Sequence, residues 1–92
     1  MSDKRARVYY EGLVQGVGFR FAAERTAAAL KLIGWVKNLD DGRVEVLCEG
    51  KEEDIKVFLE KIASIFGSYI RSNDIEWGEA TGEFDGFDIR FD

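Results

Sequence analysis

The sequence predicts an α+β sandwich in which two helices pack on one face of a mostly antiparallel, five-stranded sheet. Three observations support this prediction. Strand-like segments and two segments with helical periodicity alternate along the chain, an Asp-Asp-Gly turn joins the central strands, and the order is strand, helix, strand, strand, helix, strand, followed by a short last strand. This order is that of the split β-α-β, ferredoxin-like arrangement. We expect a single domain over residues 1–92.

The first half of the chain contains a strand, a glycine loop and a helix. Residues 7–13 are strand-like because Val8, Tyr9 and Tyr10 follow one another, and they lead directly into the loop. Residues 21–32 form an alanine-rich segment in which apolar residues recur at helical spacing. The first helix is therefore expected over residues 21–32.

The second half begins with a hairpin. Residues 33–39 and 43–49 are expected as strands around a tight turn at residues 40–42, whose Asp-Gly step is a hairpin signal. The alternation places Val44, Val46 and Cys48 on one face and Arg43, Glu45, Leu47 and Glu49 on the other.

A second helix follows the hairpin. Residues 55, 58, 59, 62 and 66 are apolar and share a helical face, and three acidic residues, at 52–54, favour the positive end of the helix dipole. Further strands are expected over residues 71–77 and 87–91.

Composition restricts the possible partners and locations. The net charge of −5 argues against nucleic-acid binding, which usually needs a basic surface. The chain has neither an apolar run long enough to span a bilayer nor a secretory leader pattern, so we expect no membrane partner and a cytoplasmic, monomeric protein. Cys48 is the only cysteine and there is no histidine, so we expect Cys48 in the core and neither a metal nor a cofactor.

The loop between the first strand and the first helix is the most informative segment. Gly16 and Gly18 can take positive φ, which lets consecutive backbone N–H groups, those of residues 15–19, turn toward one anion. The next helix adds unpaired N–H groups and the positive end of its dipole. The positive charge of Arg20 is unfavourable beside the positive end of the helix dipole unless an anion lies between the two. These residues predict a phosphate or carboxylate site.

Topology brings one more polar residue to this loop. The strands of a β-α-β unit are parallel, so their carboxyl ends emerge at the same edge of the sheet. Asn38, at the end of the second strand, should therefore approach the loop at residues 15–20. On spacing alone, Asn38 is more typical of a residue that caps the following turn.

Three blocks of the sequence resemble the acylphosphatase family. Residues 14–20 read VQGVGFR, residues 34–46 read GWVKNLDDGRVEV, and the C-terminal segments at 81–84 and 87–90 read TGEF and FDIR. The resemblance implies a ferredoxin-like fold with a fifth strand at the C-terminus, and hydrolysis of the carboxyl–phosphate anhydride by metal-free, in-line attack of water. It implies that Arg20 and Asn38 are catalytic, with Arg20 holding the phosphoryl group and Asn38 positioning the water. It also implies that Gln15, Gly16, Val17, Gly18 and Phe19 bind the acylphosphate substrate and the inorganic phosphate product.

Two other functions compete with this interpretation. One is a noncatalytic module that uses the same loop to hold a phosphorylated ligand. The other is an RNA-binding domain of similar topology, which should carry exposed aromatic and basic residues on its central strands. Residues 44–46, with the sequence VEV, do not supply them.

The sequence departs from the family pattern around the first helix. Lys31 stands where the family usually has glycine, which predicts a different helix end or a strained residue costing about 1 kcal/mol. Ala22 and Ala23 stand where bulkier residues are common, which predicts slacker packing behind the loop or compensation by Phe21 or Phe66.

Overall fold

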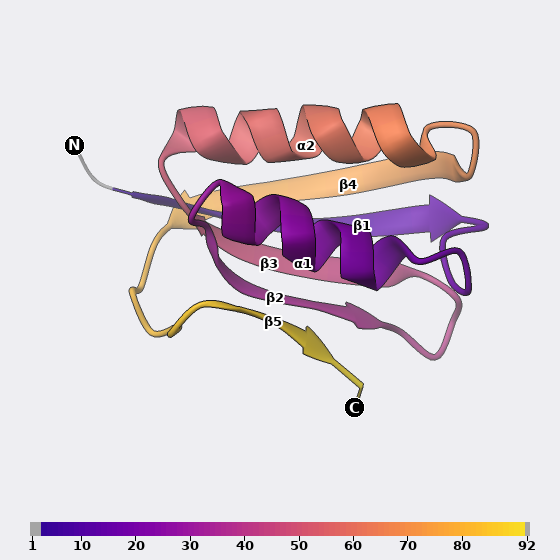
Figure 1. Ribbon diagram of the computed structural model, residues 1–92, viewed down its shortest axis with the longest axis horizontal. Coiled ribbons are helices and arrows are strands. Elements are labelled where there is room, and N and C mark those ends of the chain that lie inside the picture. Colours follow the sequence, from indigo (N-terminus) through magenta and orange to yellow (C-terminus); the bar gives the residue numbers. More distant parts are fainter. Residues whose placement is uncertain (1–2, 92) are drawn as a thin grey trace.

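The computed structural model describes residues 3–91 and places two helices on one face of a five-stranded sheet (Figure 1). The elements are β1 (Lys4–Gly12), α1 (Phe19–Ala29), β2 (Ile33–Asn38), β3 (Val44–Gly50), α2 (Glu52–Phe66), β4 (Ile70–Glu79) and β5 (Phe87–Arg90). The predicted order of elements is confirmed. Of the single domain expected over residues 1–92, Met1, Ser2 and Asp92 lie outside the described residues.

The sheet has the strand order β4-β1-β3-β2-β5. Its pairs β1–β3, β1–β4 and β2–β3 are antiparallel, whereas β2 and β5 are parallel. The sheet is therefore mixed, although mostly antiparallel as predicted. Because β1 and β2 are the parallel strands of a β-α-β unit, Gly12 and Asn38 end at the same edge, which we call the site end.

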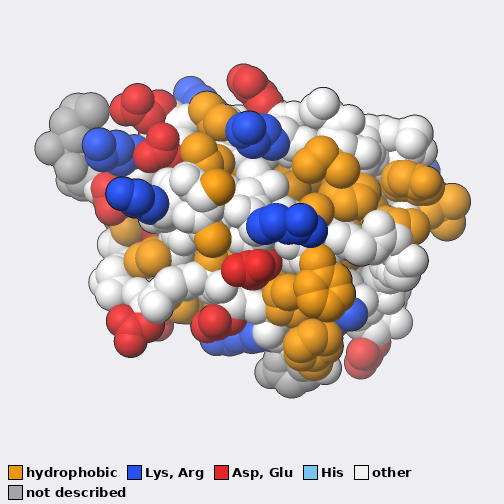
Figure 2. Space-filling model, in the orientation of Figure 1, with side chains coloured by type: hydrophobic (Ala, Val, Ile, Leu, Met, Phe, Trp, Pro, Cys, Tyr) orange, Lys and Arg blue, Asp and Glu red, His pale blue; other side chains and the backbone are white. Residues whose placement is uncertain are grey.

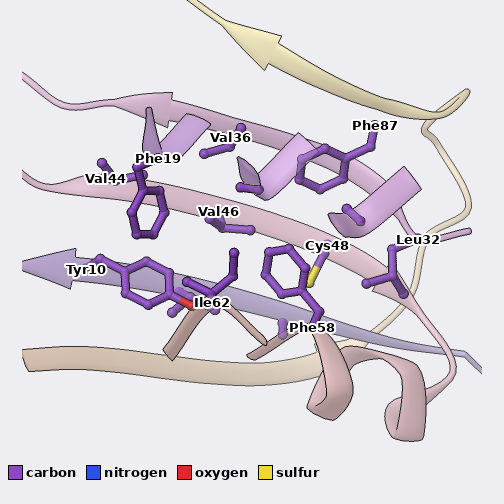
Figure 3. Packing of buried hydrophobic residues seen from close by; sticks show 14 of the residues in the cluster. Tyr10, Phe19, Leu32, Val36, Val44, Val46, Cys48, Phe58, Ile62 and Phe87 are labelled. Atoms are coloured by element: carbon purple, nitrogen blue, oxygen red, sulfur yellow. The ribbon is translucent and has the colours of Figure 1, made fainter. Parts of the chain in front are cut away.

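The core lies between the sheet and the two helices (Figure 3). Tyr10 and Phe19 pack with ring centroids 5.0 Å apart, and Phe66 adds its ring 4.7 Å from that of Phe19. Phe66 thus fills space behind the loop, as expected for compensation of the small side chains of α1, whereas Phe21 is 57% exposed. Cys48 is buried, as predicted, and burial raises the pKa of its thiol to about 12.

The bounds of α1 differ from the predicted 21–32 at both ends. The helix begins at Phe19, directly after Gly18, which takes a left-handed conformation with φ 81°. It ends at Ala29 because Lys31 also has a left-handed backbone, with φ 59°. The strained non-glycine residue that the sequence predicts is therefore present.

The helix-free face of the sheet is more buried than the alternation of β3 suggests. Glu45 and Glu49 are 5% and 1% exposed because arginine side chains of β1 lie over them: Arg7 pairs with Glu45, and Arg5 with Glu49. On the same face, the guanidinium of Arg90 covers the ring of Trp35. Trp35 is therefore only 7% exposed, because a cation covers its ring. Within residues 3–91, no helix is long and apolar enough to cross a membrane.

Candidate active site

The site end is built around the loop between β1 and α1. Gly16 and Gly18 have φ values of 78° and 81°, and a Cβ at either position would meet no atom within 4 Å. Their role is therefore conformational: they allow the backbone to bend where a side chain would be strained. No side chain caps α1, and its first turn contains no acidic residue. The N–H groups at the start of α1 remain available to an external anion.

Arg20 lies in the first turn of α1 and lines a small pocket with Asn38. Within residues 3–91, no acidic side chain forms an ion pair with Arg20. Its guanidinium carbon lies 4.7 Å from the centroid of the Phe91 ring. One face of the guanidinium is therefore covered by an aromatic ring, and the positive charge has no counterion among the described residues.

Asn38 ends β2 and enters the same pocket, as the topology predicts. Its Oδ1 atom is buried and has no hydrogen-bond partner among the described residues. The turn after β2 is instead closed by two backbone bonds, from the Leu39 N–H to the Arg43 carbonyl and from the Gly42 N–H to the Leu39 carbonyl. The Asp41 side chain also accepts from the Arg43 N–H. The side-chain oxygen of Asn38 therefore does not cap that turn, and an unpaired buried amide oxygen costs about 1–3 kcal/mol unless a ligand or water pairs with it.

The pocket has a volume of about 140 Å³. It is lined by Val14, Gly16, Gly18, Phe19, Arg20, Phe21 and Asn38. Five of the seven predicted site residues thus converge on it, the exceptions being Gln15 and Val17. Such a pocket is far smaller than the 300–1,000 Å³ typical of sites for drug-sized ligands. It suits a small anion held by N–H donors and one guanidinium.

The side chain of Gln15 has a structural role. Its side-chain amide donates to the carbonyl oxygens of Leu39 and Arg43, at 2.8 and 3.0 Å. The Gln15 side chain therefore ties the glycine loop to the β2–β3 turn, which holds Asn38 and the loop in a fixed relation. Only the backbone N–H of Gln15 remains for the anion-binding role that the sequence predicts.

Val14, Phe21 and Phe91 were missed as residues of the site. Val14 is fully buried and forms part of the pocket wall. Phe21 lies off the buried stripe of α1, which the structure places at Phe19, Ala23 and Ala27. A large apolar residue outside the apolar stripe is a signal that could have identified Phe21, whereas nothing in the sequence places Phe91 against Arg20.

Within residues 3–91, no group of three or more His, Cys, Asp or Glu side chains could hold a metal ion. Among the described residues that line the pocket, the polar groups are the Arg20 guanidinium, the Asn38 carboxamide and the backbone N–H groups. This set can bind a phosphoryl group and orient a water molecule.

Known proteins are similar to this chain in sequence and in fold. The family model described as Acylphosphatase matches residues 6–89. An acylphosphatase of Bacillus licheniformis is 46% identical over 82 residues, which is 88% of each chain, and one of Geotalea uraniireducens is 41% identical over 88 residues, which is 95% of this chain and 97% of the relative. The crystal structure of acylphosphatase from Bacillus subtilis superposes with a TM-score of 0.87 at 37% identity, covering 95% of this chain and 98% of that one. Together with the glycine loop and the convergence of Arg20 and Asn38, these matches show that the chain belongs to the acylphosphatase family.

Proposed function

We propose that the pocket at the site end is the active site, with Arg20 and the loop amides binding the phosphoryl group and Asn38 orienting the attacking water. As a member of the acylphosphatase family, the chain is a hydrolase that splits a carboxyl–phosphate anhydride into a carboxylate and inorganic phosphate. The assignment of roles to residues is our proposal.

The chemistry required of the pocket is modest. The water oxygen attacks phosphorus, the bond between phosphorus and the acyl oxygen breaks, and the electron pair of that bond leaves on the carboxylate. The leaving carboxylate needs no proton, and the proton lost by the water ends on phosphate or solvent. Catalysis then depends on position and charge, because the transition state spreads negative charge over the phosphoryl oxygens.

Arg20 and the loop amides meet the charge requirement. A planar guanidinium can hold two phosphoryl oxygens, and each charge-assisted bond contributes about 1.5–3 kcal/mol. The uncapped N–H groups at the start of α1 add donors that are already oriented. A phosphoryl group also supplies the missing counterion of Arg20.

The single observation that supports the role of Asn38 best is its unpaired, buried Oδ1 at the wall of the pocket that Arg20 lines. A carboxamide keeps both a donor and an acceptor at every pH in the working range, so it can hold a water in a defined orientation without titrating. The cost of leaving this oxygen unpaired is offset if water or substrate binds there.

Two substitutions test the proposal. We expect Arg20→Ala and Asn38→Ala to lower kcat/KM for acetyl phosphate by at least about 100-fold, the usual effect of removing one oriented donor. Arg20→Ala should also weaken inhibition by inorganic phosphate at least about tenfold, whereas Asn38→Ala should change it much less.

Arg25→Ala is the matched control, because Arg25 lies on α1 outside the pocket. It should behave as the wild type in both measurements. Wild-type turnover by the Asn38→Ala protein would overturn the proposed water-positioning role. Phosphate binding by the wild type without any hydrolysis of acetyl phosphate would favour the noncatalytic module instead.

We also propose that the glycine loop is the phosphate-binding element and that the protein acts as a monomer in the cytoplasm. Both proposed catalytic residues, Arg20 and Asn38, belong to the same chain, and a single free cysteine is usual in a reducing compartment. Amide chemical shifts of residues 15–20 during a phosphate titration, and the molar mass from light scattering, test the first two statements.

A further inference from the structure

Two exposed phenylalanine rings stand beside the pocket. Phe21 lines it and is 57% exposed, and Phe91 is 75% exposed with its ring against the Arg20 guanidinium. Neither ring contributes to the core: Phe21 lies off the buried stripe of α1, and Phe91 follows the last residue of β5. Figure 2 shows hydrophobic side chains gathered at the edge of the molecule where α1 begins and β5 ends. Apolar side chains exposed together beside a pocket indicate a binding surface.

The size of the pocket indicates which part of the substrate contacts the two rings. The volume of about 140 Å³ is less than half of the lower bound for drug-sized ligands, so a bulky acyl group does not fit inside the pocket beside the phosphoryl group. When the phosphoryl group lies against Arg20 and the loop, the acyl group has to extend through the mouth of the pocket. Phe21, which lines the pocket, and Phe91, which lies against Arg20, are exposed side chains that can contact it there.

The charge of the pocket wall limits the kind of acyl group. Among the described residues, Arg20 is the only cationic side chain that lines the pocket, and the phosphoryl group occupies it. Apart from Arg20 and Asn38, the described part of the wall consists of apolar side chains and glycines. The described pocket wall therefore offers a carboxylate on the acyl group no cation that is free of the phosphoryl group, whereas an apolar acyl group would bury area against the rings.

We propose that Phe21 and Phe91 form an acyl-contact surface that selects acylphosphates with an apolar, especially aromatic, acyl group over those with a short or anionic one. The proposal rests on the proposed function, in which the loop and Arg20 hold the phosphoryl group. It assigns the two rings to the specificity of the reaction and leaves the chemical step to Arg20 and Asn38.

The experiment compares three substrates in one set of variants. Benzoyl phosphate carries an aromatic acyl group, acetyl phosphate a methyl group, and succinyl phosphate a carboxylate. We expect the wild type to have its highest kcat/KM with benzoyl phosphate. Phe21→Ala and Phe91→Ala should each lower that value about tenfold, in line with loss of one ring contact. For acetyl phosphate, which offers only a methyl group to the rings, the loss should be smaller, so that the ratio of benzoyl to acetyl kcat/KM falls about fivefold in each variant. Inhibition by inorganic phosphate should change less than kcat/KM for benzoyl phosphate.

Leu13→Ala and Ile65→Ala serve as controls, because both side chains are exposed, at 75% and 54%, and neither lines the pocket. They should leave the ratio of benzoyl to acetyl kcat/KM at the wild-type value. Phe91→Leu, which keeps an apolar side chain of similar bulk, should retain more of that ratio than Phe91→Ala.

Two results would overturn the proposal. In one, the phenylalanine variants lower kcat/KM equally for benzoyl and acetyl phosphate and weaken phosphate inhibition, which would mean that the rings only position Arg20. In the other, the ratio is unchanged in all variants. Both results leave the roles of Arg20 and Asn38 intact, since those depend on the separate loss of turnover in Arg20→Ala and Asn38→Ala.

Discussion

The two ends of the sheet differ in whether their polar side chains have partners within the protein. At the site end, Arg20 has no counterion among the described residues and Asn38 has an unpaired oxygen. At the other end, which we call the closed end, Glu49 is almost fully buried and its carboxylate accepts from the Arg5 side chain, the Thr81 N–H and hydroxyl, and the Gly82 N–H. Of the two buried side-chain atoms without a hydrogen-bond partner among the described residues, the Asn38 Oδ1 belongs to the pocket, where a ligand can pair with it, whereas the Tyr10 hydroxyl lies in the core. The comparison teaches that the closed end satisfies its buried charge within the protein, whereas the site end leaves groups that a ligand can pair with.

The two ends are joined by the strands that run between them. β1 and β3 pair from Lys4–Gly50 at the closed end to Tyr10–Val44 near the site. β5 starts after the segment that Glu49 binds and leads to Phe91 beside Arg20. The hydrogen bonds of Glu49 therefore hold together, at the closed end, strands whose opposite ends lie at the site end.

The largest effect is expected from breaking the closed end. Glu49→Gln removes the charge that Arg5 and two backbone N–H groups stabilise, and it places an amide where only acceptors fit. Because the group is buried, we expect the free energy of unfolding to fall by about 3 kcal/mol. Urea unfolding measures this loss.

Glu83→Gln is the control for that substitution. Glu83 also binds Arg5, but its side chain is 57% exposed, and exposed pairs contribute about 1 kcal/mol or less. The folded Glu49→Gln protein should keep kcat for acetyl phosphate within about twofold of the wild type. Equal destabilisation by the two substitutions would contradict the difference between buried and exposed partners.

The second prediction concerns the acid stability of the closed end. Burial alone would raise the pKa of Glu49, but the N–H groups of Thr81 and Gly82 and the Arg5 side chain outweigh it and hold the pKa below the ordinary value of 4.5. A carboxyl whose pKa is lowered by folding stabilises the protein fully above its unfolded pKa, and this stabilisation disappears as pH falls through the folded pKa.

The stability difference between the wild type and Glu49→Gln should therefore be constant near neutral pH and shrink below about pH 4.5. Urea midpoints at pH 7, 5, 4 and 3 measure it. A difference that stays constant down to pH 3 would show that the carboxylate charge is not what stabilises this end.

The third prediction concerns the connection between the loop and the hairpin at the site end. Gln15→Met keeps the length of the side chain but removes the amide that donates to Leu39 and Arg43. Both carbonyl oxygens also accept backbone bonds, so we expect a loss of only about 1 kcal/mol in stability. Inhibition by inorganic phosphate should weaken several-fold because the loop amides lose their fixed position. Unchanged inhibition would mean that the backbone alone holds the loop.

The closed end also shows which features of the structure cannot be predicted from local sequence pattern. Periodicity predicts both helices and all five strands, and β-α-β topology predicts that Asn38 approaches the loop, because these follow from local pattern and chain direction. The burial of Glu49 does not follow from local pattern, since alternation places it on a face that the sequence marks as polar. Its burial depends on Arg5, which is far from it in the sequence but paired with it in the sheet, and on the segment at residues 81–82. The contact between Phe91 and Arg20 is missed for the same reason.

The smallest effect is expected at Lys31, a strained residue in the connection from α1 to β2. The Leu32 N–H donates to the Ala27 carbonyl and the Lys31 N–H to the Ala28 carbonyl, which is the Schellman pattern that favours glycine at residue 31. Lys31 has φ 59°, where a side chain costs about 1 kcal/mol. Lys31→Gly should therefore raise the free energy of unfolding by a little under about 1 kcal/mol, because the added chain entropy of glycine offsets part of the relief. Lys31→Ala keeps the Cβ and should give no gain in the same urea experiment. A gain of the same size from alanine would show that removing the lysine side chain beyond its Cβ, and not relief of backbone strain, is the cause.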